Sequence, residues 1–532
     1  MVICDAESAC KACHGSPESA TTHEDCFLLF KQRYEAEDMF QRMLQRLWIL
    51  VAWRIPWRRG PISAIDEENI SIPDISAIGG YAFPMLRRLP PEIVQLIREY
   101  SPDSLLWRFG LALGLFQQLS TPASGDLVSM PLSDCLLWER DSLLAPTSCS
   151  ASCSSPKPQF IRLTIDSFGI KRIERLLELS PYNPKRSERF LFVTIKESET
   201  KDVVVHFKFG TLRLEFPDAS PGGFQIWDTE TCPPPLGRCI FFWRQSIETA
   251  QFQTIDIRKI TGITFFMAWN RVCQIHAHTA ATPTAIQTWK QIPPMRRAVL
   301  TWIYLPISLN DDIIAFGPTI AARIRSMLTR FTLLFRLRLA GDVIVGPYQP
   351  NQHGPNGNAF FALTNQPVST LVYGWPEPQN KYISTIGAVL NETPKPYQDD
   401  SLPSPQLKKP NLGFPYYSFA SLWNVIRVIV YDNPDTGFCR GILLHYNNGA
   451  ERALGQCRIG VDPAKIYDMP TYVCFIPQRY TRPNRPGQIK TAIVRCTNQD
   501  DHKHDEEGWV CTPMCHDLDF WFTQGQVDIW VD

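Results

Sequence analysis

The chain has 532 residues, of which 44% are hydrophobic and 20% are charged, and its 53 basic side chains balance its 53 acidic ones. This length predicts two to four domains. Formal neutrality excludes a protein that coats nucleic acid or an anionic membrane over a broad surface. The 44 prolines make up about 8% of the chain, against a usual share near 5%, and predict many short elements and turns.

The cysteines and the start of the chain indicate a cellular location. Sixteen cysteines in 532 residues are too few for a small disulfide scaffold. The first ten residues, MVICDAESAC, lack the basic and apolar regions of a secretory signal. The longest apolar runs, such as LWILVAW, are far shorter than the ~20 residues that cross a bilayer. We therefore expect reduced thiols, an intracellular location in the cytoplasm or nucleus, and no membrane partner.

The N-terminal quarter is predicted to be helical. Residues 1–23 are polar and small and are expected to form a flexible Cys-rich tail. Within residues 24–120, apolar side chains from Phe27 to Leu47 recur near helical spacing, and this helix is expected to end before Pro56. Residues 86–119 predict an αα-hairpin, because Pro90 and Pro91 suit a first helical turn.

The rest of the chain predicts antiparallel β structure. Residues 121–158 are rich in Ser and Pro and are predicted to be a linker. Period-two segments such as DVVVHFKF then fill a β-rich domain over 159–390. A Pro-rich connector over 391–415 leads to a C-terminal β-rich domain over 416–532, and the sequence leaves open whether the two β regions form one body. The predicted fold class is a mostly β protein with a β-prism or β-sandwich-like body and a helical N-terminal region, α+β and multidomain as a whole.

A first resemblance lies in the predicted helical hairpin. The segment LRRLPPEIVQLIREYSPDSLLWRF resembles the start of an F-box, the helical module that docks on the adaptor of a cullin ubiquitin ligase. The resemblance implies that Leu89, Pro90, Ile93 and Ile97 contact that adaptor. The alternative is an ordinary capped helical hairpin that packs on the β body.

A second resemblance covers about residues 299–390. The segments DVIVGPYQPNQHGPNGNAFFAL and VSTLVYGWPEPQNKYISTIGAVL resemble the last strands of jacalin-related lectins, which implies a β-prism fold. It also implies a sugar-binding loop that includes Tyr373, Tyr382 and Ser384. The family has an aspartate where this chain has Ser384, and a serine lacks the charged acceptor that strengthens hydrogen bonds to hydroxyls. The resemblance therefore supports the fold more than a sugar site.

Cysteine and histidine clusters suggest metal sites. The C-terminal stretch RCTNQDDHKHDEEGWVCTPMCH is rich in Cys and His and includes His502 and His504. Thiols and imidazoles are common zinc ligands. The alternative for this stretch is a solvated acidic loop. The N-terminal tail offers a second set of thiols and imidazoles, for which a disordered thiol-rich segment is the alternative. The predicted ligands of the C-terminal site are Cys496, Cys511, Cys515 and His516.

No catalytic motif accompanies these features. The sequence contains no nucleophile elbow, phosphate loop, dinucleotide fingerprint or HExxH helix. His276 and His278 alternate on a predicted strand and are expected to be hydrogen-bonded histidines without a metal. We expect a non-enzymatic intracellular recognition or adaptor protein of the F-box type, whose partner is the ubiquitin-ligase adaptor. The alternatives are a jacalin-like carbohydrate-binding protein, whose partner is a glycan, and a metal-dependent enzyme or zinc-structured binding module.

Overall fold

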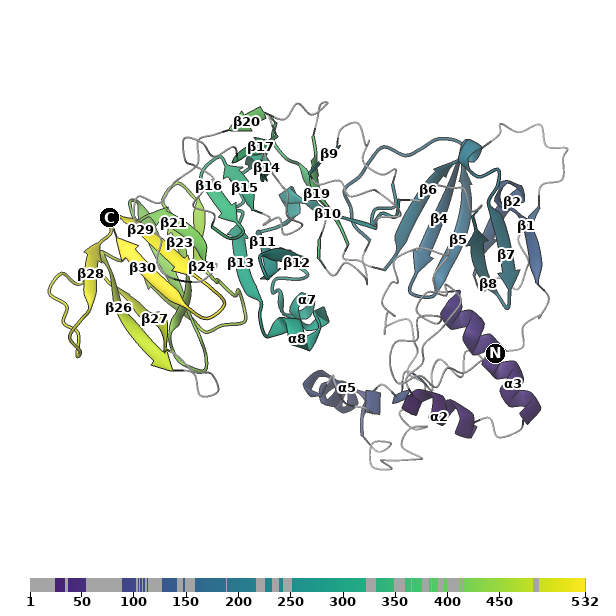
Figure 1. Ribbon diagram of the computed structural model, residues 1–532, viewed down its shortest axis with the longest axis horizontal. Helices are drawn as coiled ribbons and strands as arrows, with labels where there is room; N and C mark the ends of the chain where they lie inside the picture. Colours follow the sequence, from purple (N-terminus) through teal and green to yellow (C-terminus); the bar gives the residue numbers. More distant parts are fainter. Residues whose placement is uncertain are drawn as a thin grey trace. The chain divides into compact units, whose positions relative to one another are not determined.

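The computed structural model shows a mostly β protein with few helices, and all its strand pairs are antiparallel among the described residues (Figure 1). The chain divides into two compact units: residues 1–233 with 247–251, and residues 234–246 with 252–532. The structure describes residues 24–33, 37–53, 89–101, 104, 106–107, 109–110, 112, 127–140, 147–148, 158–187, 189–216, 225–231, 239–242, 251–321, 332–348, 359–364, 366–375, 382–383, 385–390, 397–399, 412, 415–481 and 488–531.

The first unit begins with helices. Helices α2 (Glu24–Arg33) and α3 (Glu37–Ala52) occupy the segment predicted to be helical. They pack through Phe30, Leu44 and Leu47. Helix α5 (Pro91–Tyr100) matches the first half of the predicted hairpin, whereas the second half is described only in part. The predicted tail over residues 1–23 lies outside the described residues.

Two sheets complete the first unit and share a core. The strands are β1 (Val128–Pro131), β7 (Val204–Lys208) and β8 (Thr211–Glu215) in one sheet, and β3 (Thr147–Ser148), β2 (Cys135–Glu139), β5 (Gly169–Leu176), β4 (Phe160–Asp166) and β6 (Leu191–Lys196) in the other. Short 3-10 turns are η3 (Leu132–Asp134) and η4 (Glu197–Glu199). The predicted alternation in β7 is confirmed, since Val205 and Phe207 are buried and Val204 and His206 are half-buried.

The prediction of a linker over residues 121–158 is wrong for its described part. Strands β1 and β2 fall within it, and Leu132, Cys135 and Trp138 are buried in the core of the first unit. The Ser- and Pro-rich composition of the whole segment concealed the local pattern LVSMPLSDCLLWE, whose apolar side chains suffice for two short strands.

The first part of the second unit contains three sheets. Their strands are β10 (Phe252–Asp256), β18 (Thr370–Gly374), β19 (Ile386–Val389) and β9 (Cys239–Phe242); β12 (Arg271–His278), β11 (Gly262–Ala268) and β13 (Thr301–Pro306); and β16 (Gly341–Val345), β15 (Leu333–Leu337), β14 (Ile313–Ala321), β17 (Ala359–Leu363) and β20 (Tyr397–Asp399). Between them lie the turn η6 (Ile257–Lys259) and the short helices α7 (Ile286–Gln291) and α8 (Pro294–Arg297).

The second part of this unit contains three further sheets. Their strands are β21 (Tyr416–Ser421), β29 (Asp517–Phe522) and β30 (Val527–Val531); β24 (Glu451–Gly455), β23 (Cys439–Tyr446), β22 (Val425–Asp432) and β25 (Ala464–Asp468); and β27 (Gln488–Thr497), β26 (Tyr472–Thr481) and β28 (Val510–Pro513). Strands β23 and β24 pair around Asn447, Asn448 and Gly449. Gly449 has φ +84, a value that glycine adopts without strain.

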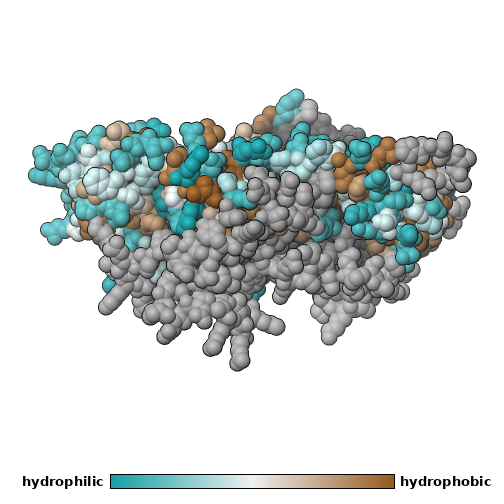
Figure 2. Space-filling model, turned by 90° about the horizontal axis from the view of Figure 1, so that it is seen from above, coloured by the Kyte–Doolittle hydropathy of each residue, from teal (hydrophilic) through white to brown (hydrophobic). Residues whose placement is uncertain are grey.

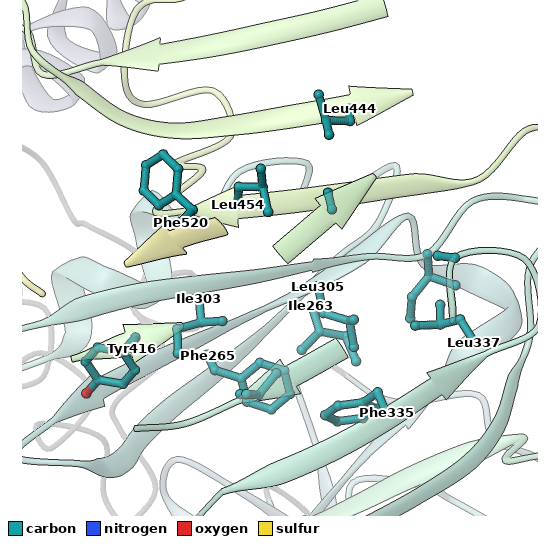
Figure 3. Close-up of a cluster of buried hydrophobic side chains, with 14 of the residues drawn as sticks. Ile263, Phe265, Ile303, Leu305, Phe335, Leu337, Tyr416, Leu444, Leu454 and Phe520 are labelled. Carbon is teal, nitrogen blue, oxygen red and sulfur yellow. The ribbon is translucent and has the colours of Figure 1, made fainter. Parts of the chain in front are cut away.

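One hydrophobic core extends through both parts of the second unit. The same buried cluster contains apolar residues between Ile255 and Leu390 and others between Tyr416 and Ile529. Figure 3 shows side chains from both parts, with Phe520 beside Leu454 and with Phe265 near Phe335. The predicted connector over 391–415 therefore does not separate two cores, and strand β20 lies within it. The predicted β domain over 159–390 is itself split, because β4 to β8 belong to the first unit.

The surface seen in Figure 2 is mainly polar where residues are described, with separate hydrophobic patches. In the described part of the chain, no helix is long and apolar enough to span a membrane.

Candidate metal centre

Four metal-ligating side chains meet at one edge of the β27-β26-β28 sheet. They are Cys474 on β26, Cys511 on β28, and His502 and His504 in the loop between β27 and β28. One ligand atom from each of the four lies within 4.8 Å of all the others. The group thus gathers two thiols and two imidazoles.

The pairing of the strands brings the two thiols together. Cys474 and Cys511 are direct partners in the antiparallel ladder of β26 and β28. Because side chains alternate across a strand, Val473 and Phe475 point into the core and Cys474 points to the opposite face. Cys474 is nevertheless only 1% exposed, whereas Cys511 is exposed.

The histidines aim their ring nitrogens at the thiols. Nε2 of His502 lies 3.1 Å from Sγ of Cys474 and 3.2 Å from Sγ of Cys511. Nε2 of His504 lies 3.1 Å from Sγ of Cys511. Nδ1 of His502 donates a hydrogen bond of 2.7 Å to the carbonyl oxygen of Gln499. This bond leaves a lone pair on Nε2, which is how metal-binding histidines are usually oriented.

An aromatic residue supports the second histidine. The rings of His504 and Trp509 stack with centroids 4.2 Å apart and planes at 7°. The guanidinium of Arg495 lies over the ring of Trp509, 5.4 Å from its centroid. The ring of His504 is therefore packed against Trp509 of the same loop.

The surroundings favour neutral side chains in the absence of a cation. Burial raises the pKa of the Cys474 thiol, and its contact with Cys511 raises it further. Partial burial lowers the pKa of His504, and the neighbouring His502 and Arg495 add to this effect. A divalent cation reverses the balance for the thiols, because a coordinating thiol is deprotonated outright.

The donor set fits zinc. Zinc sites of this class take four ligands in a tetrahedron, at about 2.3 Å for sulfur and about 2.0 Å for nitrogen, so that the ligand atoms lie roughly 3.3 to 3.8 Å from one another. The sulfur–nitrogen distances of 3.1 and 3.2 Å are close to that range. Two thiolates and two neutral imidazoles would also balance the charge of a divalent ion.

The structure includes one of the four predicted ligands in this group. Cys511 is a member, but Cys496 pairs with Val473 in the ladder and is buried in the core, where burial raises its pKa to about 12. Cys515 and His516 follow β28 and are not among the four gathered side chains. Sequence reasoning missed Cys474, because it lies 28 residues before His502 and outside the stretch that is dense in Cys and His. The N-terminal set of thiols and imidazoles lies outside the described residues.

The sequence matches no model of a known protein family and no curated protein. The resemblances to the F-box and to jacalin-related lectins therefore depend on the quoted residues alone.

The jacalin-like loop residues do not form a described site. Tyr373 lies on β18 and is 2% exposed. Tyr382 is half-buried, with the guanidinium groups of Arg271 and Arg296 over its ring at 5.2 and 5.3 Å. Ser384 lies outside the described residues.

Of the four predicted adaptor contacts, Leu89, Pro90 and Ile93 are exposed and Ile97 is half-buried. On α5, Ile93, Leu96 and Tyr100 are 41%, 45% and 88% exposed, and Leu89 just before the helix is 37% exposed. Val94 is buried. We call the exposed side chains of Leu89, Ile93, Leu96 and Tyr100 the α5 face.

The two strand histidines are hydrogen-bonded, as expected. His276 contacts Thr288 Oγ1 at 2.8 Å and the carbonyl oxygen of Thr282 at 3.1 Å. His278 donates from Nδ1 to the carbonyl oxygen of Pro283 at 2.9 Å and accepts at Nε2 from Thr264 Oγ1 at 2.7 Å.

Burial lowers the pKa of His278 below its ordinary value of 6.5. As the pH falls below about 6.5, the unfolded chain binds a proton at this position before the folded chain does, and stability falls by up to about 1.4 kcal/mol per pH unit. We expect His278→Gln to be less stable than the wild type at pH 7.5, with a gap that narrows toward pH 5. Urea unfolding at several pH values measures this gap, and a constant gap would contradict the prediction.

Proposed function

We propose that this chain is a non-catalytic recognition protein whose C-terminal sheet is held by a structural zinc ion. The observation that carries this proposal is the convergence of Cys474, His502, His504 and Cys511. Strand β26, the loop between β27 and β28, and strand β28 supply these ligands, so one ion would tie that loop to β26 and β28.

A structural role follows from the number of ligands. Catalytic zinc sites have three protein ligands and keep a fourth position for water or substrate, whereas structural sites are closed by four. Two cysteines and two histidines fill all four positions here. The proposal therefore favours a zinc-structured binding module over a metal-dependent enzyme.

Elemental analysis of the purified full chain tests this proposal. We expect one zinc per chain after purification in reducing buffer without added metal. A strong chelator is expected to remove it and to expose the loop over residues 498–509 to limited proteolysis. Folded protein that contains no metal, and that does not change when zinc is added, would refute the proposal.

The α5 face favours a second function, docking on a partner. Three apolar side chains at spacings of three and four residues lie on one side of the helix, and each is more than a third exposed. Such a stripe is typical of a helix that packs into an apolar groove. Together with the F-box-like sequence, it supports an adaptor of a cullin ubiquitin ligase as the partner.

We expect Ile93→Asp to weaken adaptor binding at least about 10-fold, because a buried interface anchor contributes about 2 to 4 kcal/mol. The fold should be unaffected, since Ile93 is 41% exposed. Leu137→Asp is the matched control, because Leu137 is an exposed apolar residue on β2 of the same unit. Binding of the purified adaptor measures the effect, with a known F-box protein as the positive control. Failure of the wild type to bind would end the adaptor hypothesis.

A further inference from the structure

We propose that Cys474 and Cys511 form a reversible disulfide when the protein meets hydrogen peroxide, and that this modification releases the metal. The inference rests on the proposed zinc site for the release step. The disulfide itself follows from the geometry of the two thiols, whether or not the ion is bound.

The ladder places these two cysteines in a geometry that allows a disulfide. They are direct cross-strand partners, and direct partners in an antiparallel pair have Cα atoms about 4.5 to 5.5 Å apart. This falls within the range of about 4.4 to 6.8 Å that disulfides require. The sulfur atoms lie within 4.8 Å of each other, so side-chain rotation would bring them into bonding distance.

The different exposure of the two thiols assigns their roles. Cys511 is exposed and accessible to a small oxidant, whereas Cys474 is 1% exposed beneath His502. Cys511 is therefore the residue that peroxide oxidises, and Cys474 is the resolving residue. Cys439, Cys457 and Cys496 are also buried, but none of them is a ladder partner of an exposed cysteine among the described residues.

The reaction is balanced with peroxide as the only oxidant. The Cys511 thiolate attacks one oxygen of hydrogen peroxide, an S–O bond forms, the O–O bond breaks, and the departing hydroxide takes a proton to become water. Cys474, which loses its proton as it reacts, then attacks Sγ of Cys511: the S–S bond forms, the S–O bond breaks, and the departing hydroxide takes that proton to become water. Two thiolates lose two electrons in total, and peroxide is reduced to two waters.

Loss of both thiolates leaves the ion with two imidazole ligands. A closed zinc site requires four ligands, so the ion dissociates and the His502–His504 segment is no longer tied to the strands. A dithiol reductant returns the two electrons, restores both thiols and allows zinc to bind again.

The test treats the full chain with about one equivalent of hydrogen peroxide. Zinc release is followed with a chromogenic chelator, and disulfides are mapped by mass spectrometry of non-reduced peptides. We expect one Cys474–Cys511 disulfide for each zinc released, and recovery of both thiols with dithiothreitol. Cys474→Ser should abolish the disulfide and leave a sulfenic acid at Cys511 that dimedone traps. Cys515→Ser is the control and should behave as the wild type.

The two proposals fail in different ways. Protein that contains no zinc but forms the Cys474–Cys511 disulfide would refute the zinc site and support the modification site. Zinc release without this disulfide, or oxidation directed to other cysteines while Cys511 stays a thiol, would overturn the inference.

Discussion

Replacement of Cys511 by serine is expected to abolish stoichiometric zinc binding. A serine hydroxyl is a poor zinc ligand at neutral pH. Even mutation of a residue that only hydrogen-bonds to a metal ligand lowers metal affinity by about 10- to 100-fold. We therefore expect the affinity to fall by more than about 100-fold. If the free zinc ion is at about 100 times the dissociation constant of the wild type, the variant's site falls to half occupancy or less, and the lost stabilisation is about 2 to 3 kcal/mol. Competition with a chelating dye and thermal unfolding measure the two quantities.

Cys515→Ser is the matched control for this experiment. Cys515 is the next cysteine in the chain and is half-buried, but it is not one of the four gathered side chains. It should retain one zinc and wild-type stability. Equal loss of zinc in both variants would show that the ligands had been assigned wrongly, and no loss in Cys511→Ser would contradict the site.

Replacement of Phe520 by alanine is expected to destabilise the whole second unit by about 3 to 5 kcal/mol. Phe520 is fully buried on β29, and removal of a large aromatic side chain from a packed core leaves a cavity as well as losing transfer free energy. Its ring fits closely against Gly455, where an added Cβ would lie 2.4 Å from Phe520 Cε1. Because the core is continuous, peptides from β11 and β12 should lose protection from hydrogen exchange together with peptides from β26 and β27.

Trp423→Ala provides the control for this second prediction. Trp423 is also a large aromatic residue of the second unit, but it is 59% exposed, and its loss should change stability by less than about 1 kcal/mol. Denaturant unfolding and hydrogen exchange of both variants test the account. Loss of protection in β26 and β27 alone would show that residues 255–390 form an independent body.

The antiparallel β character could be predicted because it depends on local alternation. Apolar and polar residues alternate around Val205 and Phe207, which is typical of a strand with one buried face. The Asn-Gly turn at Asn447 to Gly449 is typical of a hairpin. Domain boundaries could not be predicted in this way. Strands β1 and β2 lie in a segment whose average composition is polar. The core of the second unit contains residues between Ile255 and Ile529, and contacts over such sequence distances leave no local sequence pattern.

The candidate metal site could be predicted only in part for the same reason. The density of Cys and His after Cys496 correctly indicated the region, and Cys511 is shared by the predicted and observed sets. The choice between Cys496 and Cys474 depends on which face of the sheet each side chain occupies. The register of β26 with its two neighbours determines that face, and register is a long-range property.

X-ray absorption at the zinc edge tests the central claim most directly. The account predicts a four-coordinate ion in the full-length reduced protein, with two sulfur ligands at about 2.3 Å and two nitrogen ligands at about 2.0 Å. It also predicts that one sulfur is lost in Cys474→Ser. A spectrum with oxygen or water ligands in place of sulfur, or one that is unchanged in Cys474→Ser, would contradict it.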